Sequence, residues 1–188
     1  MRESLFDPRI YRRIMGKLNF LWHTRPDIAY SVQHLSQFLQ APQVSHMLAV
    51  IYFLRYLMNA PDLAIFLPKS TDLSLLTYSD SDRATYAHTR RFVTRYYITL
   101  GGCPISWKNK KQPTISLSSA KAKYRALWKV VAEISWLVQL LADLELVIFS
   151  PVPLYYDSQA TLHVAKNLVF HGRTKHIEVD CRYVRDSL

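Results

Sequence analysis

Two aspartates are the residues of this chain best placed to do chemistry. Asp80 and Asp157 each stand at the carboxyl end of a segment whose apolar and β-branched pattern predicts a strand. If the two strands are parallel neighbours, both carboxylates meet in one crevice of an open α/β sheet. Paired carboxylates of this kind could hold divalent cations for phosphodiester cleavage. Spacing alone leaves open the alternative that each aspartate caps a following helix or binds water.

Two lysines lie between these aspartates in the sequence. Apolar residues recur at alternating steps of three and four over residues 119–142, which predicts a long helix. Lys121 and Lys123 fall in its opening turns. Two unit charges 4 Å apart interact by about 4 kcal/mol at an effective dielectric near 20, so an ammonium group would compete with a bound cation.

A basic and aromatic cluster belongs to the next two predicted strands, residues 91–100 and 103–111. Gly101-Gly102 between them predicts a two-residue hairpin turn. Basic side chains interleaved with aromatic ones suit a nucleic-acid groove, where charge holds phosphates and rings stack on sugars or bases. The alternative is a solvated sheet face with core aromatics on its reverse. The candidate contacts are Arg90, Arg91, Arg95, Trp107, Lys108, Lys110 and Lys111, beside Tyr96 and Tyr97.

The overall charge agrees with a polyanionic partner. The 188 residues carry a formal charge of +10, and 49% of them are hydrophobic, so we expect a folded protein with a proper core. Release of counterions from phosphates would then favour nucleic acid over a membrane. A basic surface that serves only solubility is the alternative.

The spacing of the cysteines and the composition of the first residues favour an intracellular protein, in the cytoplasm or the nucleus. Cys103 and Cys181 offer at most one bridge and form no Cys-x-x-Cys pair. The first residues have no hydrophobic signal core, and no apolar run is long enough to cross a bilayer. Zinc is not expected, because three histidines lack metal-ligand spacing: His163, His171 and His176.

The elements that must position these residues form two regions. Residues 1–68 predict three helices; the second carries an apolar stripe from Ile28 to Leu39, and Ser45 is expected to cap the third. Residues 69–188 predict an α/β domain, which opens with a strand ending at Asp80. A strand over VPLYYD follows the long helix and is expected to lie parallel to the first.

Several motifs in fixed order resemble one family. The amino-terminal stretch is similar to the helical end of a copia-type retrotransposon reverse transcriptase, and the remainder is similar to that family's ribonuclease H. The first part rests on YRRIMGKLNFLWHTRPDIAYSVQHLSQF and IYFLRYL. The second rests on YSDSD, TRRFVTRYYITLGGCPISWKNKKQPTISLSSAKAKYRA, YYDSQATLHVA and VFHGRTKHIEVDCRYVRDSL. The resemblance implies a ribonuclease H-like mixed sheet that cuts the RNA strand of an RNA–DNA hybrid with Mg²⁺.

The resemblance also assigns the metal ligands. Four acids hold Mg²⁺ in the family, and the first and third correspond to Asp80 and Asp157. The second belongs on the long helix, where the family reads Ser-Ser-Ala-Glu-Ala-Glu-Tyr. Lys121 and Lys123 stand at those glutamates, and Lys123 aligns with the catalytic one. The resemblance therefore implies that Lys123 neutralises the acidic crevice in place of a metal. The fourth acid lies, in the family, beyond the point that corresponds to Leu188, so we expect a domain without its last strand and helix.

These departures favour an impaired enzyme that still binds a hybrid or an RNA-like duplex. Arg95 is a further departure, since relatives carry glycine there. No cofactor is expected, except Mg²⁺ if activity survives. Two alternatives remain open. One is an active metal-dependent ribonuclease H, and the other is a recruited, non-catalytic interaction protein whose partner binds the amino-terminal helices.

Overall fold

The computed structural model describes residues 3–69, 71–82, 93–112, 119–146, 148 and 151–156. It is a mixed α/β structure, and the chain divides into two compact units, Met1–Phe66 and Leu67–Leu188. The first unit is helical and the second contains a four-stranded sheet. None of the described helices is both long and apolar enough to span a bilayer.

The helical unit consists of three helices and one short 3-10 turn. A proline begins the first helix, and the side chain of Asp7 caps it by accepting from the Arg9 amide at 2.9 Å. Tyr11 is fully buried in the core, and its hydroxyl donates to the Leu35 carbonyl at 2.7 Å. The elements are α1 (Pro8–Leu21), η1 (Pro26–Ile28), α2 (Ala29–Ser36) and α3 (Val44–Asn59).

Two expectations for this unit are wrong in detail. Ser45 does not cap α3, because Gln43 does so through a capping box with His46, whose Nδ1 accepts from the Gln43 amide at 3.1 Å. The second helix ends at Ser36 and does not reach Leu39. Phe38 instead leaves the helix and stacks on His46, with ring centroids 3.7 Å apart.

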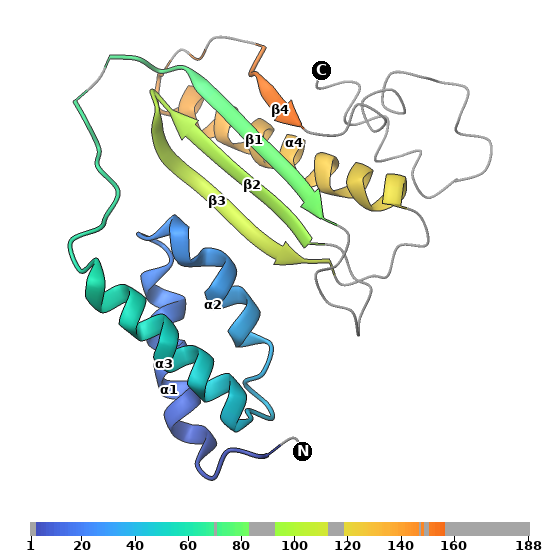
Figure 1. Cartoon of the computed structure of the whole chain (residues 1–188). Helices are drawn as coiled ribbons and strands as arrows, with labels where there is room; N and C mark the ends of the chain where they lie inside the picture. The colour runs from blue at the N-terminus through green and yellow to red at the C-terminus, as the bar shows by residue number, and fades with distance from the viewer. Residues whose placement is uncertain are drawn as a thin grey trace. The chain divides into compact units, whose positions relative to one another are not determined.

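The sheet unit contains β1 (Leu75–Asp82), β2 (Val93–Leu100), β3 (Cys103–Lys111), α4 (Ser119–Asp143) and β4 (Leu154–Tyr156). The strand order is β3-β2-β1-β4. Neighbours pair antiparallel except β1 and β4, which are parallel as expected. Figure 1 shows α4 crossing one face of this sheet.

The predicted hairpin between β2 and β3 is confirmed. Gly101 and Gly102 adopt φ values of 55° and 78°, a conformation that glycine reaches at least cost. A Cβ at Gly101 would also collide with the backbone carbonyl of Asp72, whereas Gly102 has open space around it. The turn pairs Leu100 with Cys103, and a register shift between Ile98 and Thr99 then sets the pairing of the strand segments that carry the basic cluster.

The first strand is shifted along the chain relative to its prediction. Asp72 does not enter it, because its carboxylate accepts from the amide and hydroxyl of Ser74 at 2.8 and 2.9 Å. The strand begins at Leu75 and continues past Asp80 to Asp82. Asp80 consequently lies within β1 rather than at its carboxyl end.

Alternation along the strands separates the two faces of the sheet. The core against α4 contains Leu75, Tyr96 and Ile98 from the strands, with Val130, Leu137 and Leu141 from the helix. Because side chains alternate, Tyr78, Asp80, Arg95 and Tyr97 belong to the face away from α4.

Candidate nucleic-acid interface and acidic site

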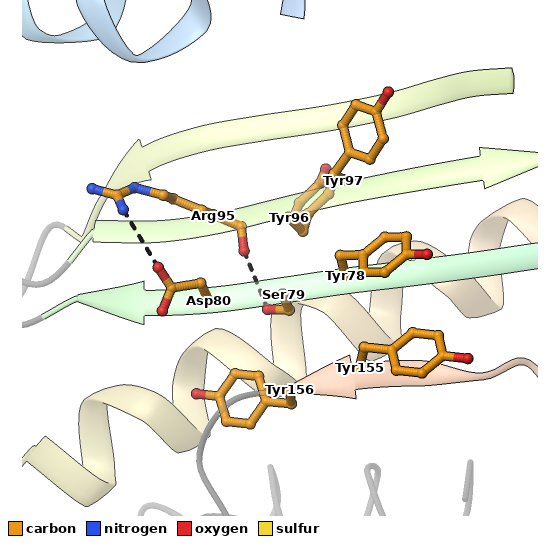
Figure 2. Close-up of a pocket in the computed structure, with 8 residues that line it drawn as sticks. All are labelled: Tyr78, Ser79, Asp80, Arg95, Tyr96, Tyr97, Tyr155 and Tyr156. Atoms are coloured by element: carbon orange, nitrogen blue, oxygen red, sulfur yellow. Dashed lines mark hydrogen bonds and ion pairs between the residues drawn. The ribbon is translucent and has the colours of Figure 1, made fainter. Parts of the chain in front are cut away.

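An ion pair links Asp80 to the neighbouring strand. Asp80 on β1 stands opposite Arg95 on β2, and Arg95 Nη1 lies 3.4 Å from Asp80 Oδ2. The two side chains are 40% and 32% exposed, so water screens the pair. Figure 2 shows the guanidinium group reaching along the sheet to the carboxylate. The structure thus supplies a cation to Asp80 from the position where the resemblance leads us to expect glycine.

The start of α4 is held at the end of β4. The Tyr156 hydroxyl donates to the backbone carbonyl of Lys123 at 3.0 Å. Tyr156 immediately precedes Asp157 in the sequence, so the contact brings the helix turn of Lys123 to the strand that leads into that acid. Asp157 itself and the side chain of Lys121 lie outside the described residues.

The Asp80 side chain and helix α4 lie on opposite faces of the sheet. Ser79 and Tyr156 are register partners on the α4 face, whereas Asp80 follows on the other face. Arg95 is the cation that the structure brings to Asp80. The expected role of Lys123 as a counter-ion also involves Asp157, so it stays a prediction.

The described residues do not assemble a metal centre around Asp80. Within this part of the chain no group of three or more His, Cys, Asp or Glu side chains comes together. Glu133 on α4 accepts a hydrogen bond from the Ser106 hydroxyl at 2.9 Å and is committed to β3. Among the described residues, Arg95 places a guanidinium against the Asp80 carboxylate, and this positive group opposes cation binding.

A basic groove lies on the α4 side, between β3 and the helix. It is a pocket of about 260 Å³, in which Lys108 and Lys110 from β3 face Lys129 from α4. Lys108 Nζ lies 5.9 Å from the centroid of the Tyr96 ring, within the range of a cation–π contact. The other lining residues are Thr94, Trp128, Ala132 and Glu133. We call this the β3–α4 groove.

The Lys129 ammonium is repelled by the other positive charges in and beside the groove. Burial lowers the pKa of the Lys129 ammonium below its ordinary 10.5, and repulsion from Lys110, Lys108 and Arg125 lowers it further. Burial also raises the pKa of the Tyr96 hydroxyl above its ordinary value. An anion in the groove would relieve the repulsion, so the arrangement favours a phosphate-bearing ligand.

The predicted basic cluster is divided between the two faces. Lys108 and Lys110 lie on the α4 side, as shown by the Ser106–Glu133 hydrogen bond in the same alternation. Arg95, Trp107 and Lys111 lie on the other side by strand register. Arg90, Arg91 and the three histidines near the carboxyl end lie outside the described residues.

Sequence reasoning missed Lys129 and Trp128 as groove residues. The signal was present, because Arg125 and Lys129 are four apart and share one helix face. Which strand edge that face meets depends on the tertiary packing, which the helical pattern does not contain.

Comparison with known proteins gives the chain its family. It is 40% identical over 185 residues to the retrovirus-related Pol polyprotein from transposon RE1 of Arabidopsis thaliana, covering 98% of the chain and 13% of the relative. The polyprotein from transposon RE2 of the same plant is 39% identical over 185 residues, with the same coverage. The polyprotein from transposon TNT 1-94 of Nicotiana tabacum is 37% identical over 180 residues, covering 95% of the chain and 13% of the relative.

The chain belongs to the retrovirus-related Pol polyproteins of copia-type transposons. The resemblance identified from its motifs is thereby confirmed. The chain spans 13% of the length of these relatives, so it corresponds to one segment of a Pol polyprotein. No family model matches the chain, and no solved structure does.

Proposed function

We propose that this Pol segment is a ribonuclease H-like module that binds RNA–DNA hybrids and cuts them poorly or not at all. The observation that carries the proposal is the β3–α4 groove, where Lys108 and Lys110 gather with Lys129 beside Tyr96 and Trp128 and, with Arg125 nearby, repel the Lys129 ammonium. Phosphates would neutralise the cations, and the aromatic rings would support the sugars. Contacts of this kind read backbone shape and charge, which suits an A-form-like duplex.

The ribonuclease H-like assignment is supported by the strand arrangement and the family. An antiparallel β1–β2–β3 meander, a long helix and a β4 parallel to β1 match the element order that the motifs imply. Asp80 on β1, and Asp157 after β4, would be the surviving members of the family's acid set.

Impaired cleavage follows from charge at those positions. If Mg²⁺ were bound, Asp80 and Asp157 would be its ligands from this chain, and the metal would polarise the scissile phosphate. The Arg95 guanidinium lies against Asp80, and lysine replaces glutamate at positions 121 and 123. Each change adds positive charge where a cation needs ligands.

A salt titration tests the binding half of the proposal. Affinity for a fluorescently labelled RNA–DNA hybrid should fall with rising salt, and Lys108→Gln with Lys110→Gln should reduce the logarithmic salt slope by about 2. Arg13→Gln with Lys17→Gln is the matched control, since both residues are exposed on α1. A slope that is the same in both double variants would exclude the groove as the binding site.

A cleavage assay tests the catalytic half. The unchanged chain should leave the RNA strand intact in Mg²⁺ or Mn²⁺. A repaired variant carrying Lys121→Glu, Lys123→Glu and Arg95→Gly should bind Mn²⁺ more tightly than the unchanged chain. Metal-dependent cleavage by the unchanged chain at the rate of the repaired variant would refute the impairment, whatever the titration shows.

A second candidate function, protein interaction, is favoured by the outer face of α3. Leu48, Tyr52 and Met58 are 60%, 75% and 77% exposed, an unusual density of apolar surface for a helical unit with its own core. The proposed partner is the reverse transcriptase segment of the polyprotein. Association of the two segments in analytical ultracentrifugation should be lost in a Leu48→Lys, Met58→Lys variant; persistence would exclude this face.

A further inference from the structure

An aromatic row crosses the sheet on the face away from α4. Tyr155 on β4 is the register partner of Tyr78 on β1, and Tyr78 is the partner of Tyr97 on β2. Tyr97 in turn stands opposite Trp107 on β3. One ring from each of the four strands therefore lies in a single cross-strand line, with neighbouring Cβ atoms about 5 Å apart.

The tyrosines of this row are accessible. Tyr155, Tyr78 and Tyr97 are 55%, 45% and 36% exposed. Tyr78 and Tyr155 stack on each other with ring centroids 5.2 Å apart and planes 16° from parallel. Figure 2 shows the three rings side by side over three strands, with the hydroxyls of Tyr78 and Tyr155 pointing the same way.

A shallow pocket follows the row and ends at a charged pair. Its volume is about 540 Å³, within the roughly 300–1,000 Å³ typical of small-ligand sites. Asp80 and Arg95 line it beside the tyrosines. The Asp80–Arg95 contact is 3.4 Å long and both side chains are partly exposed, so the guanidinium can exchange this contact for one with another anion at little cost.

These features suit unpaired nucleobases better than a protein helix or a duplex. Flat rings on adjacent strands offer successive stacking surfaces, and each base has a π-face whatever its sequence. A duplex hides its base faces in its own stack. Tyrosines also line protein interfaces, so the charge around the row decides in favour of a polynucleotide. The strongly basic chain and Arg95 supply the charge that a polynucleotide backbone needs.

We propose that the Tyr155–Tyr78–Tyr97–Trp107 row is a stacking platform for single-stranded nucleic acid. Bases rest on the rings, and a phosphate takes the Arg95 guanidinium. The platform uses residues and a sheet face different from those of the β3–α4 groove. It extends the proposed function to unpaired strands but does not depend on the hybrid binding proposed above.

Binding of labelled oligothymidylate, followed by fluorescence anisotropy, tests the platform. Tyr78→Val with Tyr97→Val should weaken binding by at least tenfold, since loss of one stacked ring costs about tenfold. Tyr78→Phe with Tyr97→Phe keeps both rings and should bind nearly as the unchanged chain does. Tyr30→Leu, at a tyrosine of α2 that is 37% exposed, is the matched control. Circular dichroism confirms that each variant is folded.

A measurement on the unchanged chain makes the test independent of the variants. Photo-crosslinking with oligonucleotides that contain 5-iodouracil, read by peptide mass spectrometry, should mark Tyr78, Tyr97 or Tyr155. Lys108→Gln with Lys110→Gln should leave most oligothymidylate binding intact, which separates failure of the groove from failure of the platform. Equal binding by the valine and phenylalanine variants, or crosslinks confined to other residues, would overturn the inference.

Discussion

The two units of the chain use an arginine–aspartate pair in opposite ways. In the helical unit, Arg25 is 5% exposed, and its guanidinium donates two hydrogen bonds of 2.9 Å to the Asp27 carboxylate. The same guanidinium donates to the Ala60 carbonyl at 3.1 Å, and the Tyr56 hydroxyl donates to Asp27 at 3.0 Å. In the sheet unit, Asp80 and Arg95 meet through one longer contact of 3.4 Å at the surface.

The difference separates a pair that builds the fold from a pair that occupies a site. The buried Arg25 guanidinium pairs with Asp27, whose side chain is 30% exposed, through two hydrogen bonds and joins η1 to the end of α3. Removing the arginine would leave the Asp27 carboxylate and the Ala60 carbonyl without this donor. An exposed pair contributes little to stability and can exchange partners. We infer that the charges of the sheet unit are available to ligands because the fold does not depend on them.

The largest effect is expected at Arg25. Arg25→Met keeps most of the buried volume but leaves the Asp27 carboxylate and the Ala60 carbonyl without their donor. The helical unit should lose about 2–3 kcal/mol of unfolding free energy. Hydrogen-exchange mass spectrometry across a urea series reports each unit separately. Arg13→Met is the control, and an equal change in both variants would contradict a structural role for the network.

Acid should weaken the same network. The hydrogen bond from Arg25 is the main cause that holds the Asp27 pKa below its ordinary value of 3.8. Because the folded-state pKa is the lower one, the stabilisation is present above about pH 4 and is lost as the pH falls through the folded-state value. The unchanged chain should therefore lose more stability on acidification than Asp27→Asn, which has no carboxylate to protonate. If the stability of the unchanged chain and of Asp27→Asn, measured by urea unfolding, fell equally with falling pH, protonation of Asp27 would not be the cause.

A smaller effect of opposite sign is expected at Lys129. Lys129→Met removes a partly buried cation four residues from Arg125, so unfolding free energy should rise by about 0.5–1 kcal/mol. The folded-state pKa is lowered, so the penalty of the charge is present at neutral pH and is relieved as the pH approaches the ordinary 10.5. The gain in unfolding free energy from Lys129→Met should therefore shrink as the pH rises toward 10.5. The same substitution should weaken hybrid binding, because it removes a cation from the groove. A loss of stability at neutral pH would show that Lys129 supports the fold.

The smallest effect is expected at Arg95. Arg95→Gln should change the unfolding free energy by less than about 0.5 kcal/mol, because its 3.4 Å contact with Asp80 is partly exposed to water. The same urea series measures it beside Arg25→Met. A cost comparable to that of Arg25→Met would abolish the distinction between the two ion pairs.

The sequence predicted helices and turns well where residues close together in the chain determine the backbone conformation. Gly101-Gly102 gave the hairpin because two consecutive residues must adopt positive φ. The alternating steps over residues 119–142 gave α4 nearly to its observed end at Asp143. The end of α2 was missed, because Phe38 leaves the helix for a tertiary contact with His46 that no local pattern contains.

The candidate site was less predictable, since it depends on register and face. Alternation in the sequence already separates Lys108 and Lys110 from Trp107 and Lys111, and that signal was available. The Asp80–Arg95 pair and the aromatic row were not, because they require knowing which residues stand opposite across three strand pairings.

The place of β3 in the sheet has a consequence for the chain in solution. Among the described strands β3 lies at one edge, so its outer amides and carbonyls face no further strand of the described sheet. That edge carries three positive charges, from Lys108, Lys110 and Lys111, so two copies of the chain brought edge to edge would repel each other. The lysines proposed for phosphate binding would therefore also guard against fibril-like self-association, and their neutralisation would raise the tendency of the chain to aggregate.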